Sequence, residues 1–145
     1  MSQLKILKAQ PEEVKSIVGG MNAYNLSHIA AMAPTWTPLE FALKDDEGNL
    51  LGGILGGIGY WNGLEIKLLW VAEKFRSQGL GSNLLHHMET EAKKLGATIS
   101  MLDTFDFQAE GFYSKMGYKP VGEIADFPEG HRRIYFSKKL EGAEE

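Results

Sequence analysis

Apolar and polar residues recur along the chain at spacings that predict a series of strands and helices. The segment Leu4–Gln10 alternates between the two classes, which predicts a strand. A helix should begin at Pro11, which two glutamates follow, and it should weaken or end at the Gly19–Gly20 pair. The pattern dissolves from Met21 to Pro38, where we expect a broken second helix and a loop.

A β-hairpin, a strand and a long helix are predicted in the middle of the chain. Residues Leu39–Trp61 hold two apolar runs around the turn Asp45–Asn49, which is the pattern of a hairpin. The nearly continuous apolar segment Gly63–Ala72 predicts a central strand. A helix from Gln78 to Leu95, closed by Gly96, places on one face Leu80, Leu84, Leu85, Met88, Ala92 and Leu95.

The remaining elements complete the prediction of an α/β fold. Strands are expected over 97–104, 119–125 and 131–140, with a short helix over 108–118. This order favours a mixed sheet covered by helices, with one parallel crossover through the long helix. A length of 145 residues suits a single domain spanning 1–145, and no repeat or linker interrupts it.

Composition narrows the class of protein. The net charge of −4 and pI near 5.6 give no basic footprint, so we expect no nucleic-acid partner. The absence of cysteine excludes a disulfide scaffold, a cysteine nucleophile and an acyl-cysteine intermediate. The most apolar run, Leu50–Trp61, is short of the ~20 residues of a membrane span, and no pair of histidines has metal-ligand spacing. We therefore expect a cytoplasmic protein without a membrane or metal partner.

The most informative segment joins the central strand to the long helix and is called the elbow below. It reads Arg76, Ser77, Gln78, Gly79, Leu80, Gly81 and Ser82. The first N–H groups of a helix lack intrahelical partners and the helix dipole adds partial positive charge there, while glycines let a ligand approach the backbone. The elbow therefore suits a phosphate or pyrophosphate. It is neither a Walker loop nor G-x-G-x-x-G, and a solvated turn is the plainer alternative.

The elbow resembles the R/Q-x-x-G-x-G/A acetyl-CoA motif of the GNAT superfamily of N-acetyltransferases. A second match lies in FQAEGFYSKMGYKPVGE, Phe107–Glu123, which is similar to the family segment A-x-x-F-Y-x-K-x-G-F/Y. The order of elements also fits, so the resemblance covers nearly the whole chain. It implies a mostly antiparallel sheet of six to seven strands with one splayed parallel pair, flanked by helices.

The resemblance also implies roles for individual residues. The pantetheine arm of the cofactor would run along Leu69, Trp70 and Val71, with the pyrophosphate on the elbow and the Leu69 N–H facing the thioester oxygen. Asp106 stands where many members carry an asparagine that contacts the cofactor, and an ionised aspartate cannot donate that bond.

Two side chains are implied to act in proton transfer. Tyr113 would protonate the departing thiolate, and an ordinary phenol pKa of about 10 is comparable to that of the thiol. Glu65, eleven residues before Arg76, would act as the general base for the amine, although a surface acid beside Lys67 is an equal reading.

Together these features predict an acyltransferase that moves acetyl from acetyl-CoA to a primary amine by direct attack in a ternary complex. The alternatives are a non-catalytic CoA-binding sensor or interaction module, and an enzyme that uses a longer acyl-CoA. The partners would be acetyl-CoA and a small amine or peptide acceptor, and a homodimer is left open. His28 and His131 are candidates for an acceptor pocket, but no motif identifies the acceptor.

Overall fold

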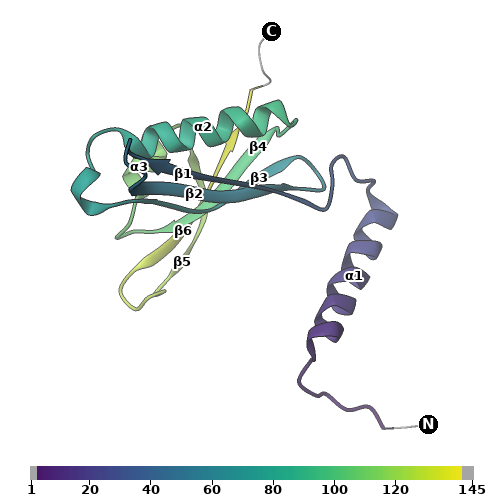
Figure 1. Ribbon diagram of the computed structural model, residues 1–145. Coiled ribbons are helices and arrows are strands. Elements are labelled where there is room, and N and C mark those ends of the chain that lie inside the picture. The colour runs from purple at the N-terminus through teal and green to yellow at the C-terminus, as the bar shows by residue number, and fades with distance from the viewer. Residues whose placement is uncertain (1–2, 142–145) are drawn as a thin grey trace. The chain divides into compact units, whose positions relative to one another are not determined.

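The computed structural model describes residues 3–141, which form two compact units (Figure 1). The first unit ends at Ala31 and contains helix α1, Pro11–His28. The prediction of a strand over Leu4–Gln10 is wrong, because this segment is irregular and no strand of the sheet pairs with it. Alternation over seven residues is compatible with a strand, but a strand also needs a hydrogen-bonding partner.

Helix α1 runs unbroken through Gly19 and Gly20, so the predicted break and second helix are also wrong. Its first turn is fixed by Pro11 and by a capping box in which the Gln10 N–H donates to Glu13 Oε1 at 2.8 Å. Glycine costs a helix about 1 kcal/mol but keeps its N–H donor, so it weakens the helix without removing a backbone bond.

The second unit begins at Met32 and contains a six-stranded sheet in the order β1-β2-β3-β4-β6-β5. The β3–β4 pair is parallel and every other neighbouring pair is antiparallel, which confirms the predicted mixed sheet. Edge strand β1 begins at Trp36 and includes Pro38, which an edge tolerates, so it starts earlier than predicted. The strands are β1 Trp36–Lys44, β2 Leu50–Gly59, β3 Gly63–Val71, β4 Ile99–Phe105, β5 Lys119–Ala125 and β6 Arg132–Lys139.

The parallel pair is short. Only residues 63–65 of β3 pair with residues 99–101 of β4, whereas β3 continues beside β2 as far as Val71. A bulge accompanies the separation, because Leu55 of β2 faces Leu68 while Gly56 faces Ile66, which leaves Lys67 as an extra residue. Strands β3 and β4 therefore diverge beyond Glu65, and we call this divergence the splay.

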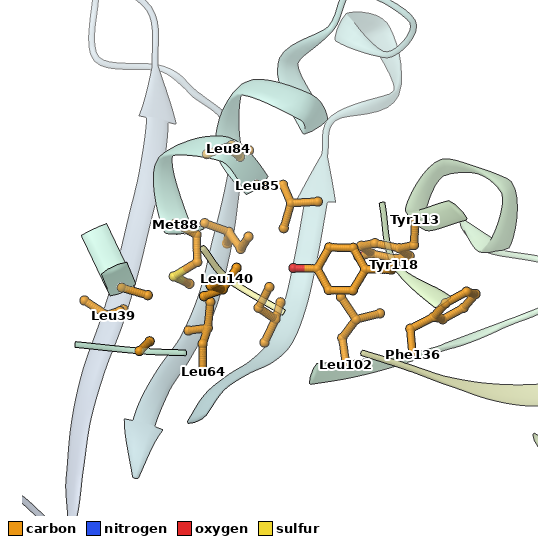
Figure 2. Close-up of a cluster of buried hydrophobic side chains, with 14 of the residues drawn as sticks. Leu39, Leu64, Leu84, Leu85, Met88, Leu102, Tyr113, Tyr118, Phe136 and Leu140 are labelled. Carbon is orange, nitrogen blue, oxygen red and sulfur yellow. The ribbon is translucent and has the colours of Figure 1, made fainter. Parts of the chain in front are cut away.

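Helix α2, Leu80–Lys94, lies across one face of β1, β2 and β3 (Figure 1). Its apolar face contributes Leu84, Leu85 and Met88 to the core (Figure 2). Leu95, predicted to belong to that face, is 52% exposed because the helix ends one residue before it. The end is a Schellman motif, in which Gly96 has φ 98° and the Ala97 N–H donates to the Ala92 carbonyl at 3.0 Å.

The C-terminal half of the sheet carries the short helix α3, Glu110–Lys115, within the predicted 108–118 segment. Its Tyr113 ring packs against Tyr118 and against Phe136 of β6, with ring centres 5.9 and 6.1 Å away (Figure 2). None of the helices within residues 3–141 is long and apolar enough to cross a bilayer.

Candidate active site

The backbone of the elbow leaves a set of N–H donors without intrahelical partners. After the 3₁₀ turn Glu73–Phe75, Ser77 and Gly79 adopt left-handed conformations with φ of 64° and 81°. The first intrahelical bond of α2 runs from the Asn83 N–H to the Gly79 carbonyl at 3.1 Å, and no side chain caps the helix. The N–H groups of residues 80–82 are therefore available to a ligand, as an anion site requires.

A groove of about 480 Å³ lies in front of these donors, and we call it the elbow groove. None of the described residues that line it is acidic, so no negative side chain among them repels a phosphate. The Arg76 Nε donates to the Val71 carbonyl at 2.8 Å, which fixes the guanidinium beside the groove. The lining residues are Leu69, Val71, Phe75, Arg76, Ser77, Gly79, Leu80, Gly81, Ser82, Gln108, Ala109, Phe112 and Tyr113.

A second groove of about 590 Å³, the splay groove, continues from the first into the gap between β3 and β4. The two grooves share Leu69, Val71 and Arg76 on one side and Gln108, Ala109 and Tyr113 on the other. The helix mouth is thus connected to the splay by one continuous surface. All the predicted cofactor residues line one or both grooves except Gln78 and Asp106.

The hydrogen-bonding groups of the β3 backbone point alternately toward β2 and toward the splay. The Ala72 N–H donates to the Leu51 carbonyl at 2.8 Å, so the backbone groups of Ala72 point toward β2. The backbone N–H and C=O groups of successive residues point to opposite sides of an antiparallel strand. Those of Trp70 therefore also point toward β2, whereas those of Leu69 and Val71 point toward the splay. The Val71 carbonyl, which binds Arg76 and not β2, agrees with this assignment. Three residues were predicted to meet the pantetheine arm. Of these, Trp70 can contribute only its side chain, because its backbone groups point toward β2.

Tyr113 lines both grooves and is only 6% exposed. Burial, with a smaller contribution from the negative charge of Asp103, raises the pKa of Tyr113 to about 12. The phenol is therefore a weaker acid than its ordinary pKa suggests. At neutral pH it is protonated and can donate a hydrogen bond into the grooves.

Glu65 is the last residue of β3 that pairs with β4, so it stands where the splay begins, and it does not line the elbow groove. It lines a third groove of about 600 Å³, the far groove, together with Asp103, Arg133 and Tyr135. The far groove and the splay groove share Ile66, Lys67, Leu102 and Asp103, so they meet at the splay. Sequence reasoning missed Asp103. The alternation of buried Leu102 and Thr104 with open positions could have placed it on the exposed face of β4.

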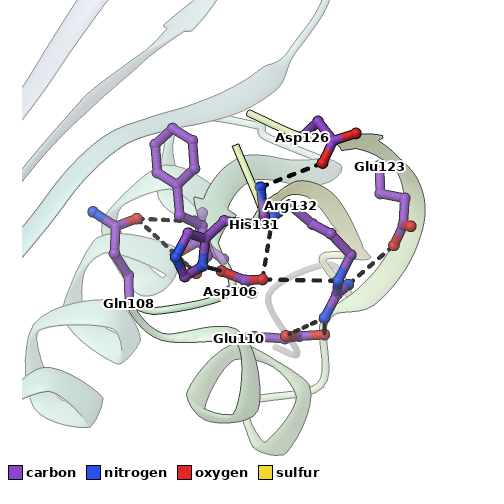
Figure 3. Close-up of polar contacts among 10 residues, drawn as sticks. Asp106, Gln108, Glu110, Glu123, Asp126, His131 and Arg132 are labelled. Carbon is purple, nitrogen blue, oxygen red and sulfur yellow. Dashed lines mark hydrogen bonds and ion pairs between the residues drawn. The ribbon is translucent and has the colours of Figure 1, made fainter. Parts of the chain in front are cut away.

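Asp106 lines neither the elbow groove nor the splay groove, and its carboxylate is held by other residues (Figure 3). Its carboxylate accepts a bond from the Arg132 N–H at 3.1 Å and lies 2.9 Å from Nδ1 of His131. The Arg132 guanidinium in turn binds Glu110 and Glu123. These contacts tie the loop after β4 to the start of β6.

Gln108, which was also not among the predicted site residues, is held at the grooves by a backbone N–H and a side-chain hydroxyl of β4. Its Oε1 accepts the Phe105 N–H at 2.9 Å and the Thr104 hydroxyl at 3.1 Å. Within residues 3–141 no group of three or more His, Asp or Glu side chains is placed to hold a metal ion.

Comparisons with known proteins find similar sequences and a similar fold. The model of the acetyltransferase (GNAT) family matches residues 15–118. The chain is 41% identical over 96 residues to blasticidin-S acetyltransferase of Streptomyces morookaense, which covers 66% of this chain and 70% of that protein. It is 28% identical over 133 residues to an acetyltransferase of Agrobacterium fabrum, covering 91% and 94%. A crystal structure of an acetyltransferase from Bacillus cereus superposes with a TM-score of 0.88 at 35% identity, covering 94% and 98%.

Proposed function

Since the chain belongs to the GNAT family of acetyltransferases, we propose that it transfers the acetyl group of acetyl-CoA to a primary amine by direct attack in a ternary complex. The observation that carries this proposal is the continuous surface from the helix mouth to the splay, with Tyr113 in its wall. A covalent acyl-enzyme would need a nucleophile, and the chain has no cysteine.

The elbow binds the pyrophosphate of the cofactor in this proposal. The free N–H groups of residues 80–82, the helix dipole and the absence of acidic lining residues all favour a doubly charged phosphate group there. Leu69 and Val71 offer backbone groups to the pantetheine arm, which then lies along β3 in the place of a paired strand.

The Leu69 N–H supplies the donor for the thioester oxygen. As the amine adds to the carbonyl carbon, negative charge grows on this oxygen, and a fixed backbone donor stabilises it without reorganisation. Glu65 takes a proton from the ammonium, directly or through water, so that the nitrogen lone pair can attack. Its place in the far groove, which meets the splay groove, supports this role.

Tyr113 acts when the carbon–sulfur bond breaks. Its O–H donates a hydrogen bond to the departing sulfur and supplies the proton that converts the thiolate to a thiol. Because burial raises the pKa of the phenol to about 12, Tyr113 still holds its proton at neutral pH when the carbon–sulfur bond breaks.

Two other functions remain alternatives to this proposal. A CoA-binding sensor would keep the elbow and need neither Glu65 nor Tyr113, and an acyltransferase for longer chains would need room beyond the splay. The first acceptor to test is blasticidin S, because a relative at 41% identity is a blasticidin-S acetyltransferase. Polyamines, amino acids, aminoglycosides and peptide N-termini complete the panel.

The test is the release of free thiol from acetyl-CoA in the presence of each amine, with mass spectrometry of the product. We expect thiol release that depends on the amine and a product heavier by one acetyl group. A protein that binds CoA by calorimetry but releases no thiol with any amine would instead be the sensor. Faster turnover with butyryl-CoA than with acetyl-CoA would favour the longer acyl group.

A further inference from the structure

Among residues 3–141, Asp103 is the only acidic residue that lines both the splay groove and the far groove. It lies on β4 two residues beyond Met101, the last residue that pairs with β3, and so stands at the start of the splay. Because side chains alternate along a strand, Asp103 and Met101 project from the same face of the sheet. Asp103 thus borders the passage between the two grooves.

The orientation of the Asp103 carboxylate is fixed by Arg133. Asp103 pairs with Tyr135 on β6, and Arg133 is the diagonal neighbour. The Arg133 Nε donates to Asp103 Oδ1 at 3.0 Å. Three aromatic rings hold the guanidinium in place, with its central carbon 5.7 Å from Phe105, 5.8 Å from Phe127 and 5.4 Å from Tyr135.

The second carboxylate oxygen of Asp103 is available to a ligand. Among residues 3–141, no hydrogen bond reaches Asp103 Oδ2, and the side chain is 35% exposed. The two cations of the far groove are already engaged, since Arg133 binds Asp103 and the Lys67 Nζ lies 5.2 Å over the Trp36 ring. The contribution of Asp103 to the raised pKa of Tyr113 places its charge near the proposed acid as well.

We propose that Asp103 Oδ2 binds the ammonium group of the acceptor and orients it toward the splay, so that Asp103 selects cationic primary amines. This inference rests on the proposed function, because it names the group that receives the acceptor of that reaction. Asp103 binds the amine, whereas Glu65 takes its proton. The N–H bond breaks toward Glu65, and the freed lone pair forms the new bond to the acetyl carbon.

The division of roles between the two carboxylates gives the test. Asp103→Asn keeps the Oδ1 acceptor for Arg133 and nearly all the volume, and removes the charge. With blasticidin S and with 1-aminobutane as acceptors, we expect KM for the amine to rise about tenfold or more, with kcat within about threefold. Glu123→Gln is the matched control, because Glu123 is also paired with an arginine, at 3.0 Å, but lines none of the three grooves. Its KM should not change.

A binding measurement separates this inference from the proposed function. Titration of 1-aminobutane hydrochloride into the CoA-bound protein, followed by NMR, should show binding that weakens about tenfold in Asp103→Asn, while 1-butanol should not bind. Arg133→Lys, which loses the Nε donor but keeps the charge, should weaken binding less. If wild type and Asp103→Asn bind the amine equally, Asp103 is not the acceptor site, whatever the outcome of the acetylation assay. If binding depends on Asp103 but no acetyl transfer occurs, the proposed function fails and the amine site stands.

Discussion

The Tyr118 hydroxyl donates a 2.7 Å hydrogen bond to Oε2 of Glu89 on helix α2. The two residues are 29 positions apart in the sequence. The same hydroxyl lies 2.8 Å from Ser100 Oγ, and Lys138 Nζ donates to Glu89 Oε1 at 2.8 Å. Glu89 is 6% exposed and Ser100 is fully buried. A buried carboxylate of this kind is tolerated only because its oxygens are satisfied.

Removal of the Tyr118 hydroxyl should therefore destabilise the fold without affecting catalysis. In Tyr118→Phe, the Glu89 carboxylate keeps Lys138 but loses one bond, and we expect a loss of about 1–3 kcal/mol in the free energy of unfolding. Urea denaturation measures it. Tyr60→Phe is the control, because the Tyr60 hydroxyl binds Thr35 at the surface and its loss should cost less than about 1 kcal/mol. Equal effects of the two variants would contradict this account.

A negative charge at the helix mouth should prevent cofactor binding. Gly81 lies in the first turn of α2, where an added Cβ would meet only the Phe112 ring at 3.6 Å, an ordinary contact. Gly81→Asp should therefore fold and yet weaken CoA binding by about tenfold or more, because a carboxylate would lie beside the pyrophosphate. Calorimetry with CoA measures the affinity.

The neutral variant Gly81→Asn has nearly the same volume and separates charge from size. It should lose much less affinity than Gly81→Asp. An unchanged CoA affinity in folded Gly81→Asp would remove the elbow from the cofactor site.

The pH dependence of Glu65→Gln distinguishes a base from a structural residue. A primary amine with a pKa near that of lysine is almost fully protonated at pH 7. Loss of the base should lower kcat by about 10–100-fold there, and the deficit should shrink as pH rises and free amine accumulates. Glu40→Gln, an exposed carboxylate on β1, should behave as wild type. A deficit of equal size from pH 7 to pH 10 would mean that Glu65 orients the substrate or supports the fold.

Loss of the Tyr113 hydroxyl should impair the chemical step alone. Tyr113→Phe keeps the ring that packs against Phe112 and Phe136, so stability and CoA affinity should change little. We expect kcat to fall by about 10²–10⁴-fold with an acceptor for which chemistry limits turnover. A variant that retains more than about half of the wild-type rate would exclude Tyr113 from the mechanism.

Alkaline pH offers a second measurement of the same residue. Because burial raises the pKa of Tyr113 to about 12, the folded protein holds this proton when the unfolded chain, with an ordinary phenol pKa near 10, has lost it. The stability that this group contributes is complete below about pH 10 and declines as pH rises from about 10 toward 12. The urea midpoint of wild type should fall over that range more steeply than that of Tyr113→Phe.

The predicted parts of the fold and the site are those encoded in short contiguous segments. The helix start at the elbow, most of the apolar face of α2 and the glycine that ends this helix each lie within one stretch of sequence, and the structure has α2 at Leu80–Lys94 with Gly96 after it. The cofactor site at the elbow stays a prediction. The failures have local causes too. Leu4–Gln10 has the alternation of a strand but no partner, and Gly19–Gly20 weakens a helix that a capping box and proline begin well.

The missed contacts depend on strand register, which a single sequence does not show. Asp106 meets His131 and Arg132 from 25 and 26 positions away, and Asp103 meets Arg133 from 30. These pairs follow from the antiparallel alignment of β4 with β6. A residue assigned to the cofactor by its place in a motif can therefore be engaged elsewhere, as Asp106 is.

Because β3 and β4 pair over only a short length, the sheet has two inner strand edges in addition to its two outer edges. Beyond Glu65 and Met101, backbone groups such as the N–H groups of Leu69 and Val71 face a gap and not a neighbouring strand. Unpaired strand borders invite pairing with other chains. The cofactor would cover one of these borders, so we expect the protein without CoA to aggregate faster on storage or mild heating than the protein saturated with it. Purification in the presence of CoA should then improve the yield of monodisperse protein.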